Sequence, residues 1–356
     1  MSLQPAILCI ALLCGGEAPS PTPILYSTDL FHPHDDPDDH YDLATLFALP
    51  EFEVLGVVLD LGDRQTQRTG RPAVAQMNQI AGRRVAAAVG LRDKLRTFDD
   101  KALDQPTEFQ GAVEMILDGL RRTKSPAVIF TTGSCRDLAA ALNRAPELLH
   151  EKTRAVYINV GNGPNEKQNE WNVGLDPLAY RRVLTAGLPL CWCPCFGKDG
   201  YQTLYVADQS RVVGACTAPV QNFFVYCLTK SKAEPLEFLN TGPHPLPAGP
   251  RKMWCTAPLL HAAGRRVYER GSEEFVALPT AAAANAGLAG KEVALFDFVP
   301  MRAEAADDGG LRVALDPPNP NGRVFRATHP RYQPIMAECL KNLLAELKPA
   351  ARTAPQ

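Results

Sequence analysis

The chain has 356 residues, of which 46% are hydrophobic and 21% are charged. This composition is typical of a globular protein with a large core. The formal net charge is only −2, so no strong field draws nucleic acid or an anionic membrane surface to the protein, and we expect neither as a partner.

The first 22 residues differ in composition from the rest of the chain. A short apolar run at 5–14 is followed by small and turn-forming residues, a pattern that resembles an export signal with cleavage near Ala18. The run is too short to span a membrane, and no other stretch is long enough. We therefore expect a signal peptide over 1–22, export to the periplasm or the cell exterior, and one domain over 23–350. The alternative is an N-terminus that is disordered or packs on the core.

Strand-like and helix-like segments alternate between residues 24 and 196. The expected strands are short apolar runs at 24–27, 52–60, 84–89, 127–131, 155–160 and 188–195. The expected helices have apolar residues at helical spacing and lie at 39–49, 72–82, 109–122, 136–149 and 176–186. This alternation predicts an α/β fold with a mostly parallel open sheet flanked by helices. The ligand cleft of such a sheet lies at the carboxyl ends of its strands.

The alternation weakens after residue 195, where we expect additions to the α/β core. They are a helix or buried segment at 221–228, a Pro- and Gly-rich loop at 235–252, helical spacing at 253–265, a hairpin from 291–299 and 311–315 with its turn at 307–310, and an amphipathic terminal helix at 334–347.

An acidic stretch at 27–39 separates the first expected strand from the first expected helix. Its five aspartates fall within eleven residues, and anions that close repel one another unless a cation neutralises them. A hard cation such as calcium or magnesium, bound by carboxylate oxygens, is the direct solution. The alternative is a solvated loop in which Asp38 or Asp39 caps the helix.

Three segments, in this order along the chain, resemble the inosine-uridine preferring nucleoside hydrolases. The first comprises Thr28–Asp29, the run Asp35–Asp36–Pro37–Asp38–Asp39 and the segment LATLFALPEFEVLGV at 43–57. The second is TTGS at 131–134, ahead of an expected helix, and the third is NEWNVGLDP at 169–177. The resemblance covers roughly 24–196 and, weakly, the remainder, and three ordered motifs are more specific than any one alone.

The resemblance implies calcium-dependent hydrolysis of the N-glycosidic bond of a ribonucleoside or a related ribosyl compound. In this family a calcium ion binds the ribose hydroxyls and the attacking water, and an aspartate takes the proton of that water. The transition state resembles an oxocarbenium ion, which nearby carboxylate and amide groups stabilise. Family members are commonly oligomeric, so a homo-oligomer is also expected by analogy.

The family's site residues can be carried over one at a time. Asp29 would be the calcium-bound base. The other implied metal ligands are Asp38, Asp39 and the backbone carbonyl of Thr132. The implied substrate contacts are Glu170 and Asn172, a looser match at Asn165, and Asp63 in place of the family's usual asparagine. Trp171 could stack on a nucleobase, or it could simply pack.

The last site segment of the family, which usually reads His-Asp-Pro, is not preserved. If Pro258 aligns, Thr256 and Ala257 replace the histidine and the aspartate. One calcium ligand and one acid for the leaving group would then be missing. Asp35 or Asp36 could supply the carboxylate and His261 the acid, although a histidine on a helix is usually structural. The alternative function is therefore a non-catalytic ribose- or nucleoside-binding protein that retains the metal platform.

Overall fold

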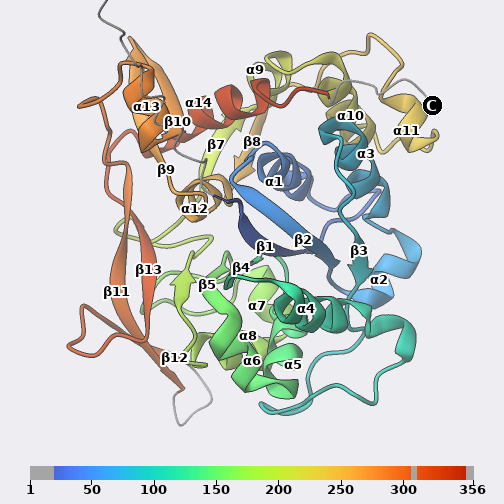
Figure 1. Ribbon diagram of the computed structural model, residues 1–356, viewed down its shortest axis with the longest axis vertical. Helices are drawn as coiled ribbons and strands as arrows, with labels where there is room; N and C mark the ends of the chain where they lie inside the picture. Colours follow the sequence, from blue (N-terminus) through green and yellow to red (C-terminus); the bar gives the residue numbers. More distant parts are fainter. Residues whose placement is uncertain (1–19, 306–310, 350–356) are drawn as a thin grey trace, which may run out of the picture.

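The computed structural model describes residues 20–305 and 311–349. Most of the expected leader and the turn expected at 307–310 lie outside these ranges. Within them, the strands form a nine-stranded sheet in the order β12-β11-β13-β6-β5-β4-β1-β2-β3 (Figure 1). The strands are β1 (Thr22–Thr28), β2 (Phe52–Leu59), β3 (Ala87–Val89), β4 (Ala127–Thr131), β5 (Thr153–Ile158), β6 (Leu190–Trp192), β11 (Phe296–Ala305), β12 (Leu311–Leu315) and β13 (Gly322–Ala327).

The sheet is parallel from β3 to β13 and becomes antiparallel only at β11 and β12. The predicted mostly parallel open sheet is therefore confirmed. Alternate residues of the central strands face opposite layers, as the period of a strand requires. On β1, Ile24 and Tyr26 join one hydrophobic core, whereas Leu25 joins the other.

Helices cover both faces of the sheet (Figure 1). One face carries α1 (Asp38–Phe47), α3 (Arg71–Ala81), α9 (Gln209–Gly214), α10 (Ala218–Leu228), α12 (Thr256–Ala262) and α14 (Tyr332–Ala345). The other carries α4 (Gly111–Arg122), α5 (Arg136–Arg144), α6 (Pro146–Lys152) and α8 (Pro177–Leu184). No helix in the described part of the chain combines the length and apolarity needed to cross a membrane.

Two expected helices differ from those observed. The helix expected over 136–149 is two helices, because Pro146 has no N–H to donate and forces Ala145 out of helical geometry, with φ −143° and ψ 67°. The helix expected over 253–265 is confined to α12. Its expected ends belong to β8 (Pro250–Met253), which pairs with β7 (Tyr205–Asp208), and to β9 (Arg265–Gly271), which pairs with β10 (Glu274–Pro279).

The expected C-terminal hairpin is only part of a larger addition to the sheet. β11 pairs with β12 as expected, but its other edge pairs with β13, which returns to lie parallel to β6. The remaining short helices are α2 (Gly62–Gln67), η1 (Thr107–Phe109), α7 (Trp171–Leu175), α11 (Pro235–Phe238) and α13 (Thr280–Asn285).

The buried side chain of Arg136 joins three segments of the chain beneath the carboxyl end of the sheet. Its guanidinium donates to the carbonyls of Leu91, Arg92 and Leu175, at 2.9–3.2 Å. It also pairs with Asp176, which is 1% exposed. Since Leu175 ends α7, this arginine fixes the position of that short helix.

We expect Arg136→Met to lower the free energy of unfolding by about 3–5 kcal/mol, because it leaves Asp176 buried and without its charge partner. Urea denaturation followed by circular dichroism measures this change. Arg121→Met, which removes an exposed pair with Asp118, is the control and should cost less than about 1 kcal/mol. Equal losses in the two variants would contradict the role given to Arg136.

Candidate active site

A cavity of about 630 Å³ lies at the carboxyl ends of four neighbouring parallel strands. Asp29 follows β1, Thr132 follows β4, Asn159 follows β5 and Cys195 follows β6, and all four line the cavity. This is the position at which open α/β sheets bind their ligands. The cavity is called the acidic pocket below, because aspartates form much of its wall.

Most of the residues predicted for the site line the acidic pocket. They are Asp29, Asp35, Asp36, Asp38, Asp39, Thr132, Glu170, Trp171 and Asn172. Asp63, Asn165 and His261 are not among its lining residues. Asp63 is exposed near the start of α2, and Asn165 is exposed in the loop after β5 with φ 63°.

His261 points into the protein core instead of the pocket. Its Nδ1 lies 2.7 Å from the hydroxyl of Tyr157, and its ring centroid lies 4.3 Å from that of Phe298. Burial, with repulsion from Arg266 and Arg323, lowers the pKa of His261 to about 4. An imidazole in this place is neutral at pH 7, so the geometry does not support the predicted role as leaving-group acid.

Four aspartates form the inner wall of the pocket and are called the inner carboxylates: Asp29, Asp38, Asp39 and Asp42. Asp39 accepts hydrogen bonds from the hydroxyls of Thr28 at 2.6 Å and Thr132 at 3.4 Å. In the described ranges none of the four forms an ion pair with Lys, Arg or His.

Burial raises the pKa of every inner carboxylate. For Asp39 the pKa rises to about 6, although its two threonine partners oppose the shift. For Asp29 and Asp38 the pKa rises well above the usual value, because repulsion from neighbouring carboxylates adds to burial. The inner wall therefore favours a proton or an added cation.

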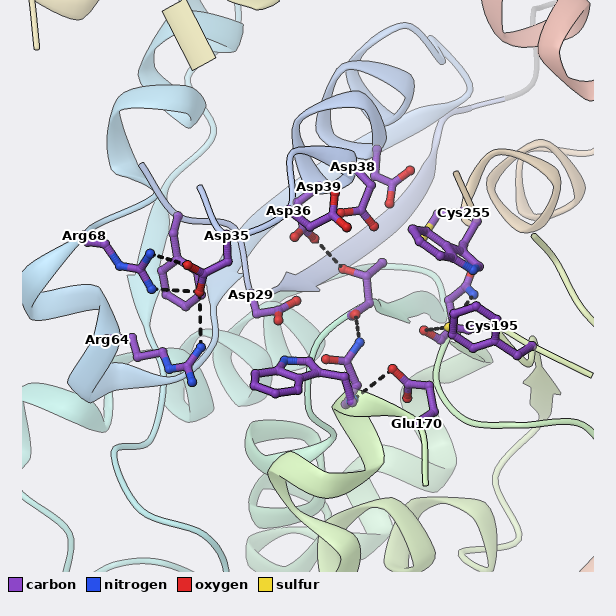
Figure 2. A pocket seen from close by; sticks show the side chains of 18 of the residues that line it. Asp29, Asp35, Asp36, Asp38, Asp39, Arg64, Arg68, Glu170, Cys195 and Cys255 are labelled. Atoms are coloured by element: carbon purple, nitrogen blue, oxygen red, sulfur yellow. Dashed lines mark hydrogen bonds and ion pairs between the residues drawn. The ribbon is translucent and has the colours of Figure 1, made fainter. Parts of the chain in front are cut away.

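Asp35 and Asp36 lie on the outer rim, where arginines neutralise them. Arg68 holds Asp35 by two hydrogen bonds, Arg64 adds a longer one at 3.4 Å, and Arg251 pairs with Asp36 at 3.2 Å. The pairing with Arg68 lowers the pKa of Asp35. Figure 2 shows Arg64 and Arg68 on one side of Asp29, and Cys195 and Cys255 on the other. Asp35 is therefore already engaged in ion pairs, which compete with its expected role as a replacement metal ligand.

The segment before and within α7 brings three side chains to the pocket. The carboxylate of Glu170 caps α7, accepting from the N–H of Asn172 at 2.9 Å, and also accepts from the N–H of Gly161 at 3.0 Å. Asn172 donates its side-chain amide to the carbonyl of Thr132 at 2.8 Å, while its Oδ1 has no partner. Trp171 is 62% exposed, and the guanidinium of Arg64 lies 5.6 Å from its ring centroid.

The sequence model of the inosine-uridine preferring nucleoside hydrolases matches residues 27–234. The chain belongs to this family. The pyrimidine-specific ribonucleoside hydrolase RihA of Enterobacter sp. (strain 638) is 27% identical over 186 residues, which is 47% of this chain and 58% of that protein. A Schizosaccharomyces pombe protein is 31% identical over 180 residues, 44% of this chain and 57% of the other. The chain thus spans somewhat more than half the length of these relatives.

Solved structures share the nucleoside hydrolase fold. The purine-preferring ribonucleoside hydrolase of Gardnerella vaginalis has a TM-score of 0.57 at 16% identity, covering 91% of this chain and 99% of its own. The plant nucleoside hydrolase PpNRh1 has a TM-score of 0.54 at 16% identity, covering 93% and 100%. At this identity the likeness establishes the fold alone.

Members of the family are typically metal-dependent, and the donor chemistry of the pocket suits a hard divalent cation. The inner carboxylates and the Thr132 carbonyl offer oxygen ligands only, and both carboxylate oxygens of Asp42 are buried without a hydrogen-bond partner. In the described ranges no three His, Cys, Asp or Glu side chains are already arranged around one point as ligands. The residues fit a cation provided that the carboxylates turn toward it.

Several pocket residues were not predicted from the sequence. Asp42 lies one turn after Asp38, a spacing that places both on one side of a helix, and this signal could have identified it. Arg64 and Gln67 lie on α2, a helix that was not expected, and Arg68 directly follows its last residue. The other unpredicted wall residues are Asn159, Cys195, Phe196, Trp254 and Cys255, and only the three-dimensional fold brings them to Asp29.

The raised pKa of Asp39 predicts how stability depends on pH when no divalent cation is present. In the folded state the Asp39 carboxyl keeps its proton up to about pH 6. Its contribution to the free energy of unfolding is therefore complete below the unfolded-state pKa near 4 and is lost as the pH rises through 6. When the pH is lowered from 7 to 4, the free energy of unfolding of wild type should therefore rise by roughly 1–3 kcal/mol relative to that of Asp39→Asn. Urea denaturation of both proteins in the presence of a chelator measures this difference. If the free energies of unfolding of the two proteins changed equally with pH, the prediction would be wrong.

Proposed function

We propose that the protein hydrolyses the N-glycosidic bond of a ribonucleoside or a related ribosyl compound, using a divalent cation held by Asp29, Asp38, Asp39 and the backbone carbonyl of Thr132. The observation that carries this proposal is the convergence of Asp29, Asp39, Thr132, Glu170 and Asn172 in one pocket of about 630 Å³. A volume of that size suits a small-molecule ligand. Support also comes from the RihA relatives, which are named as pyrimidine-specific ribonucleoside hydrolases.

The polar floor of the pocket suits a sugar. Carboxylates accept hydrogen bonds from hydroxyls, and Asn172 offers an unpartnered Oδ1 beside Thr132. If the sugar carbon gains positive charge as its bond to the base breaks, the anionic wall stabilises that charge more strongly than it stabilises the ground state. The acidic pocket therefore suits a dissociative reaction at a ribosyl carbon.

Asp29 is the proposed general base. It follows β1 directly and lines the pocket beside Asp39 and Glu170, whose charges contribute to its raised pKa. A divalent cation, when bound, supplies positive charge that lowers the pKa of nearby water and of the surrounding carboxyls. With its carboxyl ionised, Asp29 can accept the proton of an attacking water molecule.

The aromatic rim is proposed to receive the group that leaves the sugar. Trp171 presents an exposed ring, which Arg64 covers on one side. Phe31, Phe196 and Trp254 also line the pocket. A planar base would gain stacking contacts on such surfaces.

Among the described residues no histidine lines the pocket, so none is placed to protonate the leaving group. The thiols of Cys195 and Cys255 are buried, which raises their pKa. We therefore expect activated leaving groups to be cleaved faster than poor ones. The same observation favours the second candidate function, in which the protein binds a ribosyl compound without cleaving it.

Calcium as the cation, export through residues 1–22 and a homo-oligomeric state stay predictions. The family and the oxygen-only ligands support calcium. N-terminal sequencing of the protein from its host and light scattering of the purified chain test export and assembly.

Ribose release tests the proposed activity. We expect the purified chain with calcium to release reducing sugar from inosine or uridine, to cleave p-nitrophenyl riboside faster, and to lose both activities in chelator. Asp29→Asn should lower kcat by at least about a hundredfold, as removal of a general base does. Saturable binding of ribosides without any sugar release would instead establish the binding-protein alternative.

Trp171→Ala tests the proposed stacking platform. Loss of base stacking costs about 1–3 kcal/mol, so KM for the nucleoside should rise roughly 5- to 150-fold while kcat changes much less. Inhibition by free ribose, which has no base, should be unaffected. Leu103→Ala, at an exposed position outside the pocket, is the control. A change in kcat with KM unaltered would show that Trp171 does not bind the base in the ground state.

A further inference from the structure

Asp42 is an unpartnered carboxylate in the wall of the acidic pocket. It is 1% exposed, yet it lines the cavity, and neither of its carboxylate oxygens has a hydrogen-bond partner. Burial of a polar group without a partner is costly, and burial of a charge without a partner is costlier still. Such a group in the wall of a cavity indicates a ligand that enters the cavity.

The surroundings of Asp42 contain carboxylates instead of cations. Burial, with repulsion from Asp39 and Asp36, raises the pKa of Asp42, and only the neighbouring thiol of Cys255, which is a weak donor, opposes this shift. The arginines of the pocket rim are engaged elsewhere, since Arg64 and Arg68 pair with Asp35 and Arg251 pairs with Asp36. No ion pair in the described ranges involves Asp42. The missing positive charge must therefore come from outside the chain, or the group must carry a proton.

The helix brings Asp42 to the same side as two other inner carboxylates. Asp42 lies four residues after Asp38 and three residues after Asp39 in α1, and both spacings place its side chain next to theirs on the helix surface. Asp39 is held by Thr28 and Thr132, whereas Asp42 has only the weakly polar thiol of Cys255 beside it. Its carboxylate can therefore turn toward an ion at the cost of no more than this weak contact.

We propose that Asp42 is a further cation-binding residue of the acidic pocket, which joins Asp38 and Asp39 in holding one divalent cation from the first two turns of α1. This inference rests on the cation of the proposed function and adds to it a residue that the family's motifs do not mark. Asp42 is a ligand that supplies negative charge to the cation, and it does not accept the proton of the attacking water.

Calorimetric titration of the full chain with calcium tests the proposal. Asp42→Asn keeps the shape of the side chain but removes its charge, so we expect the Kd for calcium to rise at least about tenfold. The raised pKa of Asp42 adds a second readout, because a protonated carboxyl must release its proton to bind a cation. Titrations in buffers of different ionisation enthalpy should show fewer protons released by Asp42→Asn than by wild type.

Asp137→Asn is the matched control. Asp137 is also an aspartate that is 1% exposed with one unpartnered carboxylate oxygen, and its pKa is also raised, to about 7, but it does not line the pocket. Its calcium affinity should equal that of wild type. Asp42→Glu, which restores the charge, should bind calcium more tightly than Asp42→Asn, and Asp42→Ser replaces Asp42→Asn if the latter does not fold.

The outcomes separate this inference from the proposed function. Equal calcium affinity and equal proton release in wild type and Asp42→Asn would overturn the assignment and show that Asp42 is a neutral buried acid. Absence of calcium, magnesium and manganese binding in wild type would overturn it as well, even if ribose release continued in chelator. Tight calcium binding that Asp42→Asn weakens would support the assignment even if the wild-type chain released no ribose, which would refute only the hydrolase.

Discussion

Mutual repulsion of the inner carboxylates is the constraint on which the site depends. Four aspartates from the end of β1 and the first two turns of α1 face one cavity with no cationic partner in the described chain. A surface loop would relieve the repulsion by spreading its charges into water. Here the parallel sheet and the packed helix α1 hold the backbone, so the relief must come from a proton or a cation.

The surrounding structure keeps these charges close together. Asp60, at the end of β2, accepts from the N–H groups of Leu61 and Ser134, each at 2.7 Å, and so joins the loop after β4 to β2. Gly133 lies in this loop, where a Cβ atom would come within 3.0 Å of the backbone nitrogen of Asp29. The close approach of the two strand ends therefore favours glycine at 133, and it brings Thr132 within reach of Asp39.

The fold was predictable where local patterns determine it. The alternation of strands and helices predicted the parallel sheet, and the acidic stretch after the first expected strand predicted the position of the pocket. The pattern could not show that β13 returns to the sheet beside β6, because that pairing depends on contacts far apart in sequence. A single proline divided one expected helix, and helical spacing alone could not determine which face of α12 His261 occupies.

The site was predictable residue by residue only where the family motifs mark it. The acidic stretch appeared uniform in the sequence, but the structure divides it into two parts with opposite electrostatics. Asp35 has its pKa lowered by Arg68, whereas Asp38 has its pKa raised by burial and by other carboxylates. The arginines come from α2, from the residue that follows it and from β8, so their pairing could not be inferred from the stretch itself. Asp42 was overlooked because an aspartate within a helix ordinarily faces solvent.

The two ends of the pocket differ in their electrostatics. The inner carboxylates oppose the build-up of negative charge and favour positive charge on a bound group, whereas the arginines of the rim near Trp171 are paired with Asp35, which leaves that end close to neutral. A ribosyl compound that lies across the pocket, with its sugar on the carboxylates and its base toward the rim, would have its bond polarised in the direction of cleavage.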